Sequence, residues 1–233
     1  MSERSGSIYD VLLELPLFQG LSVQQLTGII EKIPFLFTQY AAGDVIVKPD
    51  SDHDQVTFVL RGRVRLTTPV CGGNVVVSQE FEAPFTAPFH YLFGAQNKTS
   101  GYLEAITDTG VMQVSKSSFL DMVQSNRIIL VHVLNMLSSV AQLQRRSLDY
   151  LEEKQLELRL AKWLLSISHH RTQLMRVDAS EPVLAELLRM RPSDLWRSIA
   201  VWEGKGCVEV TEGRLKLTDR YALKRYVSAN SFR

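Results

Sequence analysis

The chain has 233 residues, of which 45% are hydrophobic and 22% charged, with a formal net charge of +1. This composition excludes a disordered chain, and no stretch reaches the roughly 20 apolar residues of a membrane span or resembles a signal peptide. Cys71 and Cys207 are the only cysteines, too few for a disulfide framework, a zinc site or a four-cysteine iron–sulfur cluster. We therefore expect a cytoplasmic protein with no membrane contact and no metal site, long enough for two modest domains.

The charge is unevenly distributed along the chain. Residues 1–170 carry 14 Lys and Arg against 17 Asp and Glu, whereas residues 171–233 carry 12 against 8. The basic surplus at the C-terminal end indicates an anionic partner there, such as nucleic acid.

The N-terminal half changes from helical to strand-like periodicity. Residues 8–13 and 23–33 have helical spacing, with Ser22 as a candidate N-cap of the second helix. Short β-prone segments separated by turn residues then follow. They cover residues 35–40, 44–48, 56–60, 63–67, 74–81, 103–105 and 111–114. Frequent short strands of this kind predict a sandwich or barrel.

An aromatic segment, APFTAPFHYLF at residues 83–93, follows the fifth of these strands. Its side chains either line an apolar cavity or plug it, and plugging is the commoner outcome. His90 and Met112 are side chains that can bind haem iron, but a lone His among aromatic residues is far more often structural. The strand region has no clustered His and Glu ligands, which argues against a metal-dependent enzyme.

A short helix is predicted at residues 118–123, and a long one begins at Ile128. Its apolar and small polar side chains recur at heptad spacing and predict a parallel two-chain coiled coil; the alternative is a core helix packed on its own barrel. The predicted seam consists of Leu130, Val133, Leu137, Val140, Gln144, Ser147 and Leu151. Residues 151–155 contain neither Gly nor Pro, so we expect a stiff hinge there or two nearly continuous helices.

Residues 180–204, SEPVLAELLRMRPSDLWRSIAVWEG, predict two amphipathic helices that meet at a tight bend. Ser180 is a candidate N-cap, and Pro192 marks the first turn of the second helix. Leu195, Ile199 and Trp202 turn one face of that helix inward. The residues expected on its outer face, facing DNA, are Arg191, Ser193, Asp194, Arg197 and Ser198. Two β-prone stretches, 208–211 and 214–217, complete a winged helix-turn-helix.

The order of these parts resembles the CRP/FNR family of bacterial transcription regulators. The resemblance rests on LPLFQGLSVQQL (15–26), AAGDVIVKPDSDHDQVTFVLRGRVRL (41–66), RLAKWLLSI (159–167) and the winged helix. It implies an α+β protein with a double-stranded β-helix or jelly-roll β-roll at residues 1–124, a dimerisation helix at 125–154 and a DNA-binding domain at 155–233. It implies double-stranded DNA, a second copy of the chain, RNA polymerase and a small-molecule effector as partners.

The chain departs from this family where cyclic AMP binds. Relatives that bind it use a Gly-Glu pair and an Arg-Ser or Arg-Thr pair, whereas this chain has Ala95 for the Glu and Thr99 for the Arg. A single Lys98 is not a bidentate guanidinium, so cyclic AMP is not the expected effector. The candidate effector pocket comprises Phe93, Gly94, Lys98, Thr99, Ser100, Gln144 and Arg145.

The helix-turn-helix departs from the family pattern too. Arg189 stands where the family has Gly, which requires a left-handed Arg or a different turn. Pro192 replaces a polar residue, so Arg197 is the expected base-reading side chain. The favoured hypothesis is a dimeric DNA-binding regulator that senses an unidentified effector. The alternative is a ligand-independent DNA-binding or interaction module with a plugged β-roll.

Overall fold

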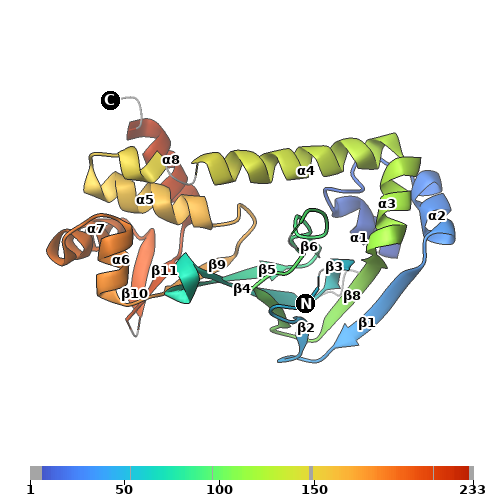
Figure 1. Ribbon diagram of the computed structural model, residues 1–233, viewed down its shortest axis with the longest axis horizontal. Coiled ribbons are helices and arrows are strands. Elements are labelled where there is room, and N and C mark those ends of the chain that lie inside the picture. Colours follow the sequence, from blue (N-terminus) through green and yellow to red (C-terminus); the bar gives the residue numbers. More distant parts are fainter. Residues whose placement is uncertain (1–6, 53, 96, 147–148, 212, 231–233) are drawn as a thin grey trace. The chain divides into compact units, whose positions relative to one another are not determined.

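The computed structural model describes residues 7–52, 54–95, 97–146, 149–211 and 213–230. It divides the chain into two compact units whose elements are drawn in Figure 1. The N-terminal unit comprises Met1–Val64 and Glu82–Val140, and the C-terminal unit comprises Arg65–Phe81 and Ala141–Arg233. Both combine helices with antiparallel strands, which confirms the predicted α+β class. Within the described ranges, no helix is both long and apolar enough to cross a membrane.

The N-terminal unit is a β-roll flanked by helices. Its elements are α1 (Ile8–Glu14), α2 (Val23–Lys32), β1 (Phe35–Tyr40), β2 (Val45–Val47), β3 (Gln55–Arg61), the start of β4 (Arg63–Val70), β6 (Phe85–Thr86), β7 (Tyr102–Ala105), β8 (Thr109–Ser115), α3 (Lys116–Ser125) and most of α4 (Arg127–Arg146). Four strands form a sheet in the order β1-β8-β3-β6, and β2 pairs antiparallel with β7.

The core of this unit is mainly aliphatic and contains four buried phenylalanines, Phe18, Phe58, Phe89 and Phe119. Phe58 on β3 faces Met112 on β8 in the strand register, and both side chains are fully buried. Phe18 lies 5.6 Å from Phe58, ring centre to ring centre, and Phe119 of α3 packs near Phe89. Burying such large rings adds to the stabilisation that a roll of short strands can obtain.

The turn between β3 and β4 depends on Gly62. This residue has φ +92°, and a Cβ there would lie 2.5 Å from the carbonyl oxygen of Asp108. A side chain would therefore be strained by the backbone conformation and would also collide with the neighbouring turn.

The C-terminal unit includes a hairpin whose residues lie, in sequence, between the two segments of the N-terminal unit. Its elements are the rest of β4, the 3₁₀ turn η1 (Cys71–Gly73), β5 (Val75–Glu82), the 3₁₀ turn η2 (Asp149–Glu152), α5 (Leu156–Ile167), β9 (Leu174–Asp178), α6 (Glu181–Leu187), α7 (Pro192–Gly204), β10 (Val208–Thr211), β11 (Arg214–Leu217) and α8 (Arg220–Asn230). Its sheet runs in the order β10-β11-β9-β5-β4, which Figure 1 shows as the hairpin running alongside β9.

The hairpin is part of the hydrophobic core of this unit. Val75 and Val77 of β5 are buried in the same cluster as Trp163, Leu195 and Trp202 of the helices. In the strand register, Val77 lies opposite Val177 of β9. The C-terminal unit thus completes both its sheet and its core with residues that precede it by about 80 positions.

The long helix is shorter than the sequence suggested. The expectation of two nearly continuous helices through residues 151–155 is wrong, because α4 ends at Arg146 and α5 begins at Leu156. Between them, η2 brings Tyr150 into the core of the C-terminal unit, where the residue is 7% exposed. Burial of this large side chain favours a separate turn over a continued helix.

Candidate nucleic-acid interface

Helices α6 and α7 meet at a left-handed turn. Ser180 takes the N-cap position of α6, although its hydroxyl makes no capping hydrogen bond. Arg189 adopts φ 52°, and the N–H of Met190 donates to the carbonyl of Ala185 at 2.8 Å. Pro192 is the first residue of α7. The left-handed Arg189 and the start of the second helix at Pro192 are therefore confirmed.

Arg159 of α5 holds this turn from behind. Its Nη1 donates to the carbonyl oxygens of Leu188 and Arg189, both at 3.1 Å. Its Nε and Nη2 donate to the carbonyl of Glu153 at 2.9 and 2.7 Å. One guanidinium thus satisfies carbonyl groups that a helix end leaves unpaired. These bonds connect the turn to the segment before α5, and they explain how a non-glycine residue is kept in a left-handed conformation.

A buried carboxylate holds two exposed arginines at the start of α7. Asp194 has a side chain only 8% exposed, and its Oδ2 accepts from Nε of Arg191 at 2.8 Å. Its Oδ1 accepts from Nη1 of Arg197 at 3.4 Å. The arginine side chains remain 81% and 69% exposed. The hydrogen bond from Arg191 is the main cause of the lowered pKa of Asp194, so the carboxylate stays charged and orients both guanidinium groups.

The predicted outer face of α7 is partly wrong. Asp194 and Ser198 are buried, although we placed both on the DNA-facing side. Each immediately precedes an inward apolar residue, Leu195 or Ile199, so both fall within the wide inner stripe of the helix. The hydroxyl of Ser198 is satisfied there by donating to the carbonyl of Asp194 at 2.8 Å. Arg191, Ser193 and Arg197 are exposed, as expected.

The sequence interpretation missed Trp196 on the exposed side. Its residue is 44% exposed, whereas Trp163 and Trp202 are buried. The helical period could have predicted this exposure, because Leu195 and Ile199 define the buried stripe and Trp196 lies one position beyond it. The exposed face of α7 is therefore Arg191, Pro192, Ser193, Trp196, Arg197, Ala200 and Glu203.

The wing, β10 and β11, is attached to α7 and to the neighbouring sheet. The N–H of Val210 donates to Oε1 of Glu203 on α7 at 3.0 Å. Lys216 pairs with Glu209 at 3.0 Å across the hairpin, and Arg214 pairs with Asp178 of β9 at 2.9 Å. The predicted β-hairpin behind the second helix is thereby present.

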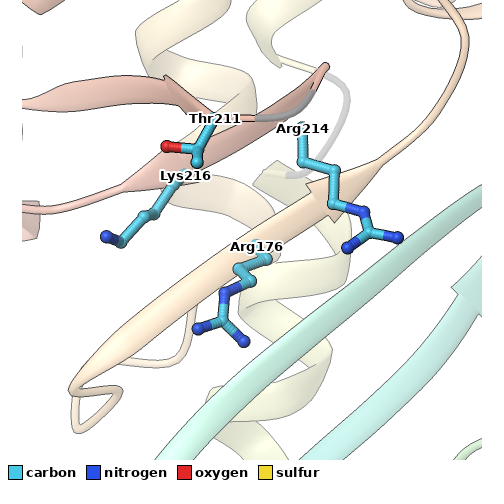
Figure 2. A pocket seen from close by; sticks show the side chains of 4 residues that line it. All are labelled: Arg176, Thr211, Arg214 and Lys216. Atoms are coloured by element: carbon cyan, nitrogen blue, oxygen red, sulfur yellow. The ribbon is translucent and has the colours of Figure 1, made fainter.

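A shallow basic pocket lies on the outer face of this sheet. Arg176, Thr211, Arg214 and Lys216 line a cavity of about 230 Å³, smaller than the roughly 300 Å³ at which small-molecule pockets begin. Figure 2 shows their charged ends pointing in different directions instead of toward a common centre. Arg176 also has a carboxylate partner, Glu80, at 3.4 Å. The arrangement is thus a balanced surface network and not a convergent anion site.

The candidate effector residues are divided between the two units. Phe93, Gly94, Lys98, Thr99 and Ser100 lie on one loop of the N-terminal unit, whereas Gln144 and Arg145 lie on the part of α4 that belongs to the C-terminal unit. In the loop, the hydroxyl of Thr99 accepts from the N–H of Gly101 at 3.1 Å, and its carbonyl accepts from the N–H of Asp50 at 2.7 Å. Lys98 is exposed. These bonds use the hydroxyl and the carbonyl of Thr99 for contacts with the backbone of its own unit.

The aromatic segment before this loop fills the roll. Phe89 is 5% exposed, and Leu92 is fully buried in the core cluster that also holds Phe58 and Phe119. Met112 is fully buried in the same cluster, which leaves its sulfur no open face toward a haem. No three His, Cys, Asp or Glu side chains come together as a metal site among the described residues.

The long helix packs one face on its own unit. Ile129 and Val133 are buried in the core, and Leu137 is half-buried against it. Leu130 and Leu134 are exposed, Leu134 by 53%. Of the other predicted seam residues, Val140 is half-buried, Gln144 is exposed, Leu151 packs against the core of the C-terminal unit, and Ser147 lies outside the described residues. The exposed apolar face is thus rotated from the predicted seam.

Comparisons with known proteins bear on the class of protein. Residues 158–226 match the model of the Crp-like helix-turn-helix domain. The catabolite activator protein of Thermus thermophilus is 18% identical, with a TM-score of 0.51 over 92% of this chain and 99% of that one. FixK2 of Bradyrhizobium japonicum (17% identity, TM-score 0.47, 83% and 97% covered) and the sensor domain of the regulator DNR of Pseudomonas aeruginosa (14%, 0.48, 60% and 96%) also align. Among curated proteins the sequence has no match.

Residues 158–226 carry a Crp-like helix-turn-helix domain, which is a DNA-binding class of domain, and the fold of the chain is that of a catabolite activator protein. Both findings agree with the resemblance to the CRP/FNR family that the sequence predicted.

Proposed function

We propose that the chain binds a specific DNA sequence as a homodimer and regulates transcription in the cytoplasm, with α7 as recognition helix. One observation carries the proposal: buried Asp194 holds the exposed Arg191 and Arg197 at the start of α7. The N-terminal part of a recognition helix contacts base edges in the major groove, and Arg binds guanine O6 and N7 in a bidentate manner. We assign base reading to Arg197 and backbone contacts to Arg191 and Ser193. Asp194 acts by orienting the arginines.

Replacing the base-reading arginine tests this proposal. Arg197→Ala should lower specific affinity by about 1 to 3 kcal/mol, because the guanine contact is lost. The measurement is fluorescence anisotropy on a duplex selected from genomic fragments by the wild-type protein. Arg225→Ala removes an equal charge from the exposed side of α8 and is the matched control. Equal losses in both variants would show that α7 makes no base-specific contact.

The homodimer is proposed through the exposed face of α4. Leu130, Val131 and Leu134 project from this face without burial in their own unit, and apolar side chains at such spacing suit a helix–helix interface. Leu134→Glu should dissociate the dimer in analytical ultracentrifugation, because a carboxylate would be buried unpaired. Ser139→Glu places the same charge about 140° further round the helix and should leave the dimer intact. A dimeric Leu134→Glu protein would place the interface elsewhere.

The second part of the proposal concerns the effector to which the regulator responds. We retain a sensor (1–124), a dimerisation segment (125–154) and a DNA-binding part (155–233) as functional divisions, with an unidentified effector that is not cyclic AMP. RNA polymerase is the expected protein partner. The buried Phe89 and Leu92 favour a second candidate, a regulator that binds DNA without an effector because its roll is plugged.

Operator affinity measured with and without cyclic AMP and other candidate effectors separates these alternatives. Equal affinity throughout supports the ligand-independent regulator, and a large change with one compound supports a sensor. A large response to cyclic AMP would contradict our choice of effector class.

A further inference from the structure

The exposed face of α7 has an unusual composition for a surface that contacts DNA. Besides the two arginines it presents Pro192, Ser193, Trp196, Ala200 and Glu203. Of these, Ser193 and Glu203 have polar side chains, and Oε1 of Glu203 already accepts from the N–H of Val210 on the wing. Hydrogen-bond readout of bases needs side chains such as Arg, Asn or Gln. On this face, Arg191 and Arg197 are the exposed side chains with a fork of donors suited to guanine, and Pro192, Trp196 and Ala200 are apolar.

Trp196 is the largest of these apolar side chains. The other two tryptophans of the chain are buried in the core of the same unit, whereas Trp196 leaves 44% of its surface in water. Its neighbours one helical turn away, Pro192 and Ala200, are short and exposed, so neither is long enough to cover the indole. A large aromatic group is thus presented on the helix face that also carries Arg197.

The charged side chains on this face of α7 indicate the kind of partner that binds it. Arg191 and Arg197 flank the apolar surface and are held outward by buried Asp194, which suits a polyanion and opposes close contact with another basic surface. In the major groove, the apolar group on a base edge is the C5 methyl group of thymine.

We propose that Trp196 is a specificity-determining residue that contacts a thymine methyl group in the operator. This inference rests on the proposed function, since it assumes that α7 enters the major groove. It adds a second element of readout beside Arg197: an apolar contact that distinguishes thymine from cytosine and from uracil.

The test removes single methyl groups from the DNA. In the operator that the wild-type protein selects, each thymine is replaced in turn by deoxyuridine, which lacks only the methyl group. Loss of one buried methyl should weaken wild-type binding roughly 3- to 10-fold at one position of each half-site. Trp196→Ala should bind the unmodified operator correspondingly more weakly and should no longer respond to deoxyuridine at that position. Trp196→Phe, which keeps an aromatic face, should respond in part.

The outcomes are distinguishable. A flat deoxyuridine scan with the wild-type protein, or an equal response in wild type and Trp196→Ala, overturns the inference and leaves the proposed function standing. Normal operator binding by Trp196→Ala together with lost binding to RNA polymerase also overturns it and assigns the indole to a protein contact. If the wild-type protein selects no sequence, the proposed function fails, and this inference fails with it. Equal unfolding midpoints of wild type and variant show that the change is not one of stability.

Discussion

The two units build their cores from different parts of the chain. The N-terminal unit fills its roll with residues from its own strands, loops and helices, among them Phe58, Phe89 and Phe119. The C-terminal unit takes Val75 and Val77 from a hairpin whose two ends continue into the roll at Val64 and Glu82. The unit that carries the helix-turn-helix domain therefore needs a segment that lies much earlier in the sequence.

Polar contacts also connect this hairpin to the rest of the C-terminal unit. Oε1 of Gln79 accepts from the N–H of His169 at 2.6 Å, and its Nε2 donates to the carbonyl of Ile167 at 3.2 Å. Glu80 pairs with Arg65 of β4 at 3.0 Å and with Arg176 of β9 at 3.4 Å. Strands β4 and β5 thus connect the roll covalently to the sheet that carries the wing.

The largest predicted effect tests this dependence directly. Val77→Ala should lower the free energy of unfolding of the C-terminal unit by about 2 kcal/mol, because it leaves a cavity between β5 and the helices. Val76→Ala removes the same atoms from the half-buried opposite face of β5 and should cost clearly less. All three tryptophans lie in the C-terminal unit, so urea unfolding followed by tryptophan fluorescence monitors this unit alone. Equal, small effects of both variants would show that the hairpin is dispensable.

An element of the fold could be predicted from the sequence where it depends on residues close to one another along the chain. The strand at residues 35–40 was predicted at its observed bounds, and the winged helix-turn-helix was found because helical and strand periods are local signals. Two strands were missed. Phe85–Thr86 is only two residues long, and Leu174–Asp178 is stabilised by β5 and β11, which are distant in sequence.

The site was predicted less completely than the fold, for a related reason. A helical wheel assigns residues to faces in isolation, but the width of the buried stripe of α7 depends on how deeply α7 packs against its neighbours. Asp194 is polar and yet buried, because two arginines compensate its charge. The turn at Arg189 required Arg159, 30 residues earlier, and no local pattern contains that contact.

The smallest predicted effect concerns the junction between hairpin and helices, and it depends on pH. The His169 ring packs edge-on against Phe81 at 5.3 Å, and its Nδ1 accepts from the N–H of Arg171 at 3.1 Å, so the proton of the neutral ring is on Nε2. Burial, followed by the positive charges of His170, Arg171 and Arg220, lowers the pKa of His169 from 6.5 to about 4. The folded protein therefore resists protonation at this ring more than the unfolded chain does.

The sign of the pH dependence follows from this difference in proton binding. Above about pH 6.5 the ring is neutral in both states and contributes nothing, whereas between about pH 6.5 and 4 the unfolded chain binds the proton first and stability falls. Because the residue is partly exposed and solvent screens the charge, we expect a loss of about 1 kcal/mol across this range. His169→Asn keeps an acceptor for the N–H of Arg171 and does not titrate, so its stability should fall less steeply below pH 6.5. Urea unfolding at pH 7 and pH 4.5, followed by tryptophan fluorescence, measures the difference, and parallel curves for wild type and variant would show that the junction between β5 and α5 is insensitive to pH at this ring.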